Sequence, residues 1–175
     1  MNSKWTNPTR YFGDSLVSAL ILDKEGDVKK VDRDYFQFAY DSSVLQKTKE
    51  IVLTVTLKLK KAPSEALKKR NQNAMAYRKK TQPYGIFSSG CFFRNIGEAE
   101  RLRAGLPTSS AGYLVDKAGL KGTKSGNFVV SDKHANFIIH KGNGDPKDLV
   151  KLLQIIKERV KEKFGVELKE EVVVI

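Results

Sequence analysis

The chain has 175 residues, with 32 lysines and arginines against 20 aspartates and glutamates, so its formal net charge is +12. This length predicts one domain or two small ones, and it is long enough for a hydrophobic core. A hydrophobic fraction of 40% and a charged fraction of 30% are typical of a globular protein rather than a disordered one. The single cysteine excludes an internal disulfide framework and a four-cysteine zinc site, and it favours a reducing compartment.

The sequence offers no signal for a membrane or for secretion. No apolar run approaches the ~18 residues that a membrane span needs, and residues 1–5 do not begin the apolar stretch of a signal peptide. We therefore expect a cytoplasmic protein without a membrane partner.

The positive charge is concentrated in residues 46–80, which hold eleven basic residues against two acidic ones, a local charge of +9. Such a surface attracts anions, among them nucleic-acid phosphates, a nucleotide cofactor or a diphosphate substrate. Aromatic residues do not alternate with the basic ones, and the aromatic and glycine pattern of RNA-recognition modules is missing. The charge therefore predicts an anionic partner and leaves its class open.

The first third of the chain reads as β-rich. Residues 15–22 and 27–31 predict a hairpin around the polar turn 23–26. Residues 50–60 alternate between apolar and polar side chains, which predicts a half-buried antiparallel strand. The apolar face of that strand is expected to hold Ile51, Leu53, Val55, Leu57 and Leu59.

A helical stretch follows. Residues 64–80 predict a helix with a proline near its first turn, and this helix carries much of the basic cluster. Residues 81–90, rich in glycine, serine and proline, predict a loop, at which we expect a domain boundary. Short helices are expected at 99–103 and 111–118, the second ended by a glycine.

The last third mixes strands and helices. Residues 127–140 predict two short strands around a turn, and a glycine-rich break at 142–144 follows. Asp145 is expected to cap a helix that ends at Gly165, and residues 166–175 are expected to form a closing strand. Together the elements predict an α+β or α/β organisation.

Few residues suggest chemistry by themselves. A lone cysteine such as Cys91 is most often a small buried hydrophobic residue. However, Gly90 permits close approach of a ligand, and a thiol with a pKa of about 8.5 can donate a proton to a carbanion at neutral pH. His134 and His140 lack the ligand spacing of a metal site, so we expect no metal. Glu171, taken alone, reads as a surface carboxylate.

Four motifs follow one another in the second half of the chain. They are GCFFRN at 90–95, AGYLVDKAGLKG at 111–122, VSDKHANF at 130–137 and VKEKFGVEL at 160–168, which runs on to Glu171. In this order and spacing they resemble the UDP-N-acetylenolpyruvoylglucosamine reductases of peptidoglycan synthesis, the MurB family.

The first third is similar to the same family, since residues 38–43 resemble the end of its flavin domain and residues 50–59 the last strand of that domain. The resemblance implies an α+β fold in which residues 1–62 are the C-terminal remnant of the FAD-binding domain. Residues 63–80 would be a linking helix, and residues 81–175 a MurB-type C-terminal α/β substrate-binding domain. The family's N-terminal flavin-binding lobe, with its phosphate-cradling glycine loop, has no counterpart in this sequence.

The resemblance also implies an activity. Enzymes of this family use FAD to pass a hydride from NADPH to the enolpyruvyl double bond of a UDP-sugar, giving UDP-N-acetylmuramate. Cys91 stands at the position of the family's serine proton donor, and Glu171 matches the carboxylate that completes this acid step. The expected partner is the UDP-sugar, with no nucleic acid, and the expected state is a monomer that needs the missing lobe.

Binding residues are implied in the same way. Asn95 and His134 match substrate contacts, and a basic group at the end of the expected helix lies near the family's basic substrate contact. The implied substrate-binding residues are Asn95, His134, Arg78, Lys79, Lys80 and Arg94. The resemblance implies Tyr40 and Ser43 as cofactor-binding residues.

Two residues depart from the family pattern. Cys91 replaces a serine, a mild change because a thiol is more acidic than a hydroxyl and can still donate a proton. Asp41 stands where the family has an arginine that offsets negative charge on the enolate, so another cation, such as Arg94 or Lys124, would have to replace it.

Two other readings remain open at this point. The chain can be a catalytically incomplete fragment that binds the UDP-sugar without reducing it, and Asp41 favours that reading. It can also be a basic, nucleic-acid-associated protein, although the family motifs account for more residues than the charge does.

Overall fold

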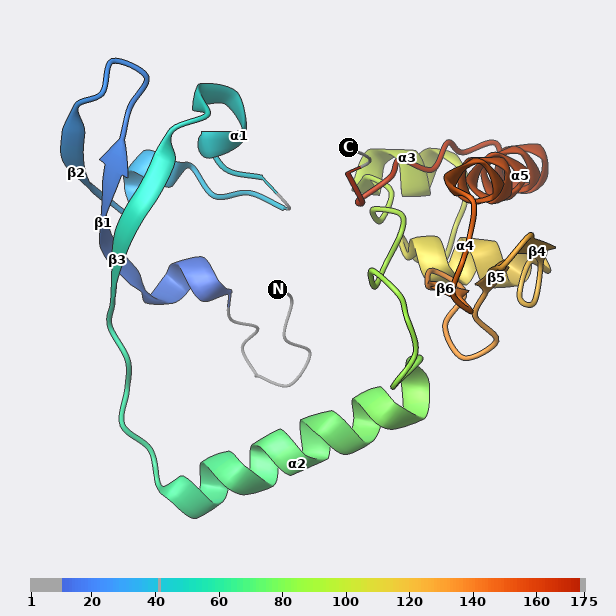
Figure 1. The fold of residues 1–175 in the computed structure, drawn as a ribbon, viewed down its shortest axis with the longest axis horizontal. Coiled ribbons are helices and arrows are strands. Elements are labelled where there is room, and N and C mark those ends of the chain that lie inside the picture. The colour runs from blue at the N-terminus through green and yellow to red at the C-terminus, as the bar shows by residue number, and fades with distance from the viewer. Residues whose placement is uncertain (1–10, 41, 174–175) are drawn as a thin grey trace. The chain divides into compact units, whose positions relative to one another are not determined.

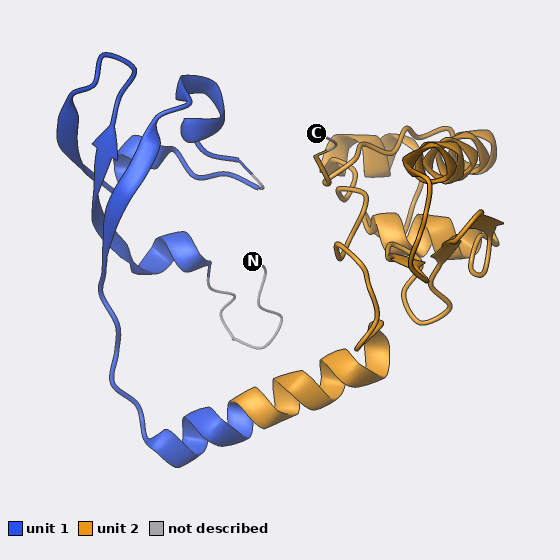
Figure 2. Cartoon of the chain, in the orientation of Figure 1, with its two compact units in different colours: residues 1–70 blue, residues 71–175 orange. Residues whose placement is uncertain are grey.

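The computed structural model describes residues 11–40 and 42–173, and it has a mixed α+β fold. The chain divides into two compact units, residues 1–70 and 71–175 (Figure 2). The division falls inside the long helix α2, Ser64–Thr81. The domain limits expected from the sequence, with a linking helix between two domains, therefore stay a proposal.

Unit 1 is built on a three-stranded antiparallel sheet in the order β2-β1-β3 (Figure 1). Its strands are β1, Leu16–Leu22, β2, Val28–Asp32, and β3, Ile51–Leu57. The hairpin of β1 and β2 is confirmed, and its turn is closed by the Asp23 carboxylate, which accepts a hydrogen bond of 2.9 Å from the Asp27 backbone N–H. A short polar turn with an aspartate at its start favours this closure.

The core of unit 1 is small. Three short helical pieces accompany the sheet: η1, Phe12–Ser15, η2, Asp34–Phe36, and α1, Leu45–Thr48. The buried apolar side chains are Leu16, Ala19, Ile21 and Phe36. Three of them belong to β1, because the central strand has neighbours on both edges.

The alternation expected along β3 is interrupted by a bulge. Val52 and Thr54 pair with consecutive residues of β1, which leaves Leu53 as an extra residue. Side chains alternate between faces only in an unbroken ladder. Ile51 and Val55 therefore lie on opposite faces, and the prediction that they share one apolar face is wrong.

The half-buried state expected for β3 is also wrong. Ile51, Leu53 and Val55 are 59%, 47% and 48% exposed, and only Leu57 is partly buried. The reason is tertiary: β3 is an edge strand, and the described helical pieces of unit 1 leave most of its side chains uncovered. An edge strand with apolar side chains on both faces is a surface that invites a partner.

Helix α2 confirms the helix expected at 64–80, and its described side chains include no buried residue. Its last turn belongs to unit 2, where the Lys133 Nζ donates a 3.3 Å hydrogen bond to the backbone oxygen of Lys79. Thr81 is the last residue of the helix, and its hydroxyl donates to the Tyr77 backbone oxygen at 2.9 Å.

Unit 2 packs helices onto a second small antiparallel sheet of order β4-β5-β6. Its elements are α3, Glu98–Arg103; α4, Ala111–Lys117; β4, Lys124–Ser125; β5, Phe128–Val130; β6, Ile138–His140; and α5, Pro146–Phe164. The two strands expected within residues 127–140 are confirmed as the β5–β6 pair.

Helix α5 forms one wall of the core of unit 2. Its residues Leu152, Ile156 and Val160 are fully buried, and the helix packs against α4, β4 and β5. Both expected ends are confirmed: the Asp145 side chain accepts from the Lys147 backbone N–H at 2.9 Å, and Gly165 has a left-handed φ of 66°. The helical spacing of the apolar residues thus predicts the buried face of this helix correctly.

The closing strand expected at 166–175 is absent from residues 166–173, the part of it that the structure describes. This segment runs beside residues 92–94, with one isolated bridge between Phe93 and Glu170. A backbone hydrogen bond lies on each side of that bridge: the segment donates one to residues 92–94 and accepts the other from them. Val166 and Leu168 are buried, so the apolar pattern reflects burial in the core and not membership of a sheet. No helix in the described part of the chain is both long and apolar enough to cross a membrane.

Candidate functional site

Three backbone segments lie side by side in unit 2. The middle one, residues 91–94, pairs on one edge with residues 136–137, where the Phe92 N–H donates to the Asn136 oxygen at 2.8 Å. On its other edge the Glu171 N–H donates to the Phe92 oxygen at 2.8 Å. Segments far apart in the sequence thus place Cys91 and Glu171 in one small region.

Cys91 is partly buried at this place. Burial raises the pKa of the Cys91 thiol, the negative charge of Glu171 raises it further, and a hydrogen bond with the Asn136 side chain opposes the rise. A thiol with a raised pKa keeps its proton at neutral pH. The arrangement suits a thiol that donates a proton rather than one that attacks as a thiolate.

Asn136 was not singled out as a site residue by the sequence. Its side chain is 4% exposed; its Oδ1 accepts from the Phe93 N–H at 2.9 Å and its Nδ2 donates to the Phe93 oxygen at 2.8 Å. A signal did exist, since an asparagine inside the apolar stretch 135–139 must find hydrogen-bond partners if that stretch is buried.

Asn95 and His134 lie around the N-terminus of α4. The Asn95 Oδ1 accepts from the Ala111 backbone N–H at 3.1 Å, and the His134 Nδ1 accepts from the Asn136 N–H at 3.3 Å. A Cβ added to Gly112 would lie 3.1 Å from the His134 ring, so a glycine there gives the ring its space. Both polar residues expected to contact substrate therefore border one helix end.

The basic residues expected to bind substrate lie in the last turn of α2 and beside Cys91. The Arg78 Nε donates to Gln82 at 3.3 Å, and the Lys79 ammonium lies 5.0 Å from the centre of the Tyr84 ring. Arg94 donates its backbone N–H to the Lys169 oxygen at 2.9 Å. With Lys80 they are the cations that the family resemblance implies as substrate contacts.

The two residues expected on the cofactor side belong to unit 1. Tyr40 is 61% exposed, and the Ser43 backbone N–H donates to the side chain of Gln46 at 3.0 Å. Asp41, the departure from the family's arginine, lies outside the described residues.

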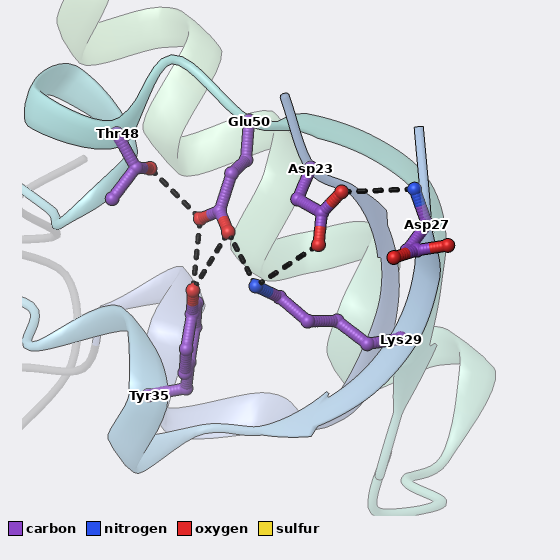
Figure 3. Close-up of polar contacts among 6 residues, drawn as sticks. All are labelled: Asp23, Asp27, Lys29, Tyr35, Thr48 and Glu50. Atoms are coloured by element: carbon purple, nitrogen blue, oxygen red, sulfur yellow. Dashed lines mark hydrogen bonds and ion pairs between the residues drawn. The ribbon is translucent and has the colours of Figure 1, made fainter. Parts of the chain in front are cut away.

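Unit 1 also contains a carboxylate network that sequence reasoning missed (Figure 3). The Glu50 side chain is only 5% exposed and accepts from the Lys29 ammonium, the Tyr35 hydroxyl and the Thr48 hydroxyl, each at 2.8 Å. The Asp23 carboxylate pairs with the same ammonium at 3.6 Å. These bonds, chiefly those from Lys29 and Thr48, lower the pKa of Glu50 to about 2. A carboxylate satisfied in this way ties elements together and is a poor proton donor.

Comparison with known proteins decides the family. Residues 82–175, more than half of the chain, match the C-terminal domain of UDP-N-acetylenolpyruvoylglucosamine reductase. The chain belongs to the MurB family.

Similar MurB reductases come from several bacteria. The chain is 39% identical to the Bacillus pumilus UDP-N-acetylenolpyruvoylglucosamine reductase over 161 residues, which is 91% of this chain and 50% of that protein. It is 36% identical to the Protochlamydia amoebophila reductase over 163 residues, 93% of this chain and 50% of that protein. The crystal structure of Thermus caldophilus MurB matches with a TM-score of 0.71 and 33% identity, over 93% of this chain and 54% of that one.

The chain thus spans about half the length of the MurB relatives that it matches. The matched C-terminal domain includes Cys91, Glu171, Asn95, His134 and Arg94. The remaining expected site residues, Tyr40, Ser43, Arg78, Lys79 and Lys80, precede it.

Proposed function

We propose that this chain is the C-terminal part of an FAD-dependent, NADPH-driven reductase. Its reaction would convert UDP-N-acetylenolpyruvoylglucosamine to UDP-N-acetylmuramate in peptidoglycan synthesis. One observation carries the proposal: within a MurB C-terminal domain, Cys91 lies beside Glu171 in surroundings that keep the thiol protonated.

The chemistry that unit 2 contributes is a proton transfer. Reduction of a carbon–carbon double bond adds a hydride to one carbon and a proton to the other, and reduced flavin, when bound, is the hydride donor. In our proposal the S–H bond of Cys91 breaks as a C–H bond forms on the carbon that carries the negative charge. The thiolate left behind lies where burial and Glu171 both disfavour a negative charge, so it recovers a proton from solvent.

Substrate binding would draw on the cations and polar groups around this thiol. A diphosphate is held well by guanidinium and ammonium groups, which Arg94 and the last turn of α2 supply. Asn95 and His134, placed at the N-terminus of α4, would contact the sugar part. These roles rest on the family pattern together with the placement of the residues in unit 2.

Unit 1 by itself fits only part of a flavin site. Tyr40 and the edge strand β3 are exposed, and the MurB relatives are about twice as long as this chain. We therefore derive no step through the flavin from unit 1 alone. In our proposal the exposed sheet is covered by the N-terminal half of a MurB protein, in the same polypeptide or in a separate one.

The test is to fuse the N-terminal half of the Bacillus pumilus relative to this chain and to follow NADPH oxidation that depends on the UDP-sugar. We expect turnover in the fusion. Cys91→Ala should lower kcat by about 10²-fold or more, the usual contribution of a general acid, whereas the control Cys91→Ser, which keeps a proton donor, should retain far more activity. A fusion that binds FAD but shows no turnover would reject the reductase; full activity in Cys91→Ala would reject the assignment of the thiol.

A second function is favoured by Asp41, which stands where the family pattern has an arginine. Unit 2 would then bind the UDP-sugar without reducing it. Calorimetric titration of the unfused chain with UDP-N-acetylglucosamine, a stable analogue of the substrate, tests this reading. Binding by the chain, combined with an inactive fusion, would favour the binding protein over the enzyme.

A further inference from the structure

The turn that connects strands β5 and β6 in unit 2 is closed around one buried hydroxyl (Figure 1). The Ser131 hydroxyl oxygen accepts from the Lys133 N–H at 3.2 Å and from the His134 N–H at 3.4 Å. The Ser131 N–H donates to the Phe137 oxygen, and the Phe137 N–H donates to the His134 oxygen, each at 2.9 Å. Because Ser131 is 4% exposed, its bonds do not compete with solvent. The backbone of His134 is therefore fixed from both sides.

The ring of His134 is fixed as well. Its Nδ1 accepts from the Asn136 N–H at 3.3 Å, and its centre lies 4.7 Å from the centre of the Phe137 ring. A Cβ added to Gly112 would lie 3.1 Å from its Cε1, so the glycine leaves the ring its space. A neutral imidazole has one nitrogen that accepts and one that carries the hydrogen. Since Nδ1 accepts, the hydrogen is on Nε2, and His134 offers a hydrogen-bond donor at that atom.

The same turn also reaches the end of helix α2. Lys133, the other residue bonded by the hydroxyl, donates from its Nζ to the Lys79 oxygen at 3.3 Å. This last turn of α2 contains Lys79 and Lys80, two of the cations implied as substrate contacts. One hydroxyl thus fixes two neighbouring residues, of which one offers a donor and the other holds the cationic end of α2.

We propose that Ser131 is a positioning residue for substrate binding: through the turn that it closes, it holds His134 as an Nε2–H donor for an acceptor oxygen on the sugar part of the UDP-sugar. The inference rests on the proposed function in so far as that function makes His134 a substrate contact. A serine that only closed a turn would affect stability alone. A positioning serine also decides which ring nitrogen of His134 carries the hydrogen and how tightly the sugar binds.

The first experiment uses the 175-residue chain with isotope-labelled histidine and measures the ring nitrogens by NMR. The chain has only two histidines, so their signals can be separated. We expect His134 to show the Nε2–H tautomer alone in the unsubstituted chain and in Ser131→Thr, which keeps the hydroxyl. Ser131→Ala should show both tautomers, because the turn relaxes and the bond from the Asn136 N–H to Nδ1 weakens.

His140 is the internal control for this measurement. Its Nδ1 accepts from the Gly142 N–H at 3.0 Å outside the turn, so its signals should be the same in all three chains. A folded Ser131→Ala variant with unchanged His134 signals would overturn the proposal. The hydrogen on Nδ1 of His134 in the unsubstituted chain would overturn it too, without any substitution at Ser131.

The second experiment is a calorimetric titration with UDP-N-acetylglucosamine. We expect Ser131→Ala to raise the Kd about tenfold, the equivalent of roughly one hydrogen bond. His134→Gln keeps an N–H near the position of Nε2 and should bind more tightly than His134→Asn, whose amide reaches only to the position of Nδ1. Equal Kd values for the two histidine variants would contradict the assignment of Nε2 as the donor.

Failure of this inference can be told apart from failure of the reductase. In the fusion, Ser131→Ala should raise KM for the UDP-sugar with little change in kcat, because Cys91 belongs to another segment. An inactive fusion, combined with the tautomer change and the weaker sugar binding in Ser131→Ala, would reject the reductase and keep the positioning role. An active fusion whose KM is unchanged in Ser131→Ala would keep the reductase and reject the positioning role.

Discussion

Glu50 and Glu171 are both carboxylates beside a titratable partner, yet they act in opposite ways. Three donors surround Glu50, so its charged form is strongly favoured and its pKa falls to about 2. The pKa of Cys91 is raised first by burial and then by the negative charge of Glu171, which disfavours a second negative charge nearby. At the scale of single residues, the neighbours of a carboxylate decide whether its charge stabilises the fold or shifts the pKa of another group.

The Glu50 network predicts an acid-sensitive unit 1. A carboxyl with a pKa of about 2 in the folded state and about 4.3 when unfolded contributes stability that is present above pH 4.3 and is lost as the pH falls towards 2. We expect the melting temperature of unit 1 to fall over this range, and Glu50→Gln to lower it by several degrees at pH 7 and to flatten the acid limb. Glu25→Gln, in the exposed turn of the same sheet, is the control. An unchanged pH profile in Glu50→Gln would contradict the prediction.

Secondary-structure elements differ in how far their own sequence controls them. The residues that fix the ends of helix α5 lie within it or next to it: Asp145 caps it, Pro146 is its first residue, and Gly165 ends it. Strand β3 has a strong apolar alternation, but a bulge at Leu53 interrupts its pairing with β1, and its edge position leaves it exposed. Local signals therefore suffice for α5 and fail for β3.

The cap of α5 can be tested by itself. Asp145→Ala removes the acceptor for the Lys147 N–H and should lower the free energy of unfolding of unit 2 by about 1 kcal/mol, measured by chemical denaturation. Asp145→Asn keeps an acceptor and should lose much less. Equal losses in the two variants would show that the charge of Asp145, acting on the helix dipole, matters more than its hydrogen bond.

The exposure of β3 gives a second prediction at this scale. Leu53→Ala should cost less than about 1 kcal/mol in this chain, because the side chain is 47% exposed at a bulge. Ile21→Ala, in the neighbouring strand and fully buried, should cost about 2–5 kcal/mol. Denaturant unfolding measures both, and comparable losses would mean that β3 is covered in solution.

For the whole molecule, the decisive facts are the two compact units and the coverage of only half of each MurB relative. Unit 2 carries the family match with Cys91 and Glu171, while unit 1 presents an exposed sheet. A division of this kind predicts that cofactor binding and thiol chemistry can be separated experimentally.

A FAD titration followed by flavin fluorescence tests this division. We expect no saturable binding to the 175-residue chain, because Tyr40 and β3 are exposed, and saturable binding to the fusion with the N-terminal half. Leu53→Asp in the fusion should weaken FAD binding by placing a charge on the surface to be covered. Tight binding of FAD by the unfused chain would show that unit 1 holds the cofactor unaided.

The sequence by itself determined the features whose causes are local. The ends of α5, the β1–β2 hairpin and the β5–β6 pair follow from caps, turn residues and apolar periodicity, and ordered motifs identified the family. The same motifs predict Cys91 and Glu171 as site residues.

Only the tertiary structure decided what lies next to what. It showed that β3 is exposed and that residues 166–173 pair with residues 92–94 around a single bridge. It also showed that Asn136 and Glu171, from separate segments, bond the backbone of the residues that follow Cys91. Burial and pKa depend on neighbours contributed by distant parts of the chain, and periodicity along one element carries no information about them.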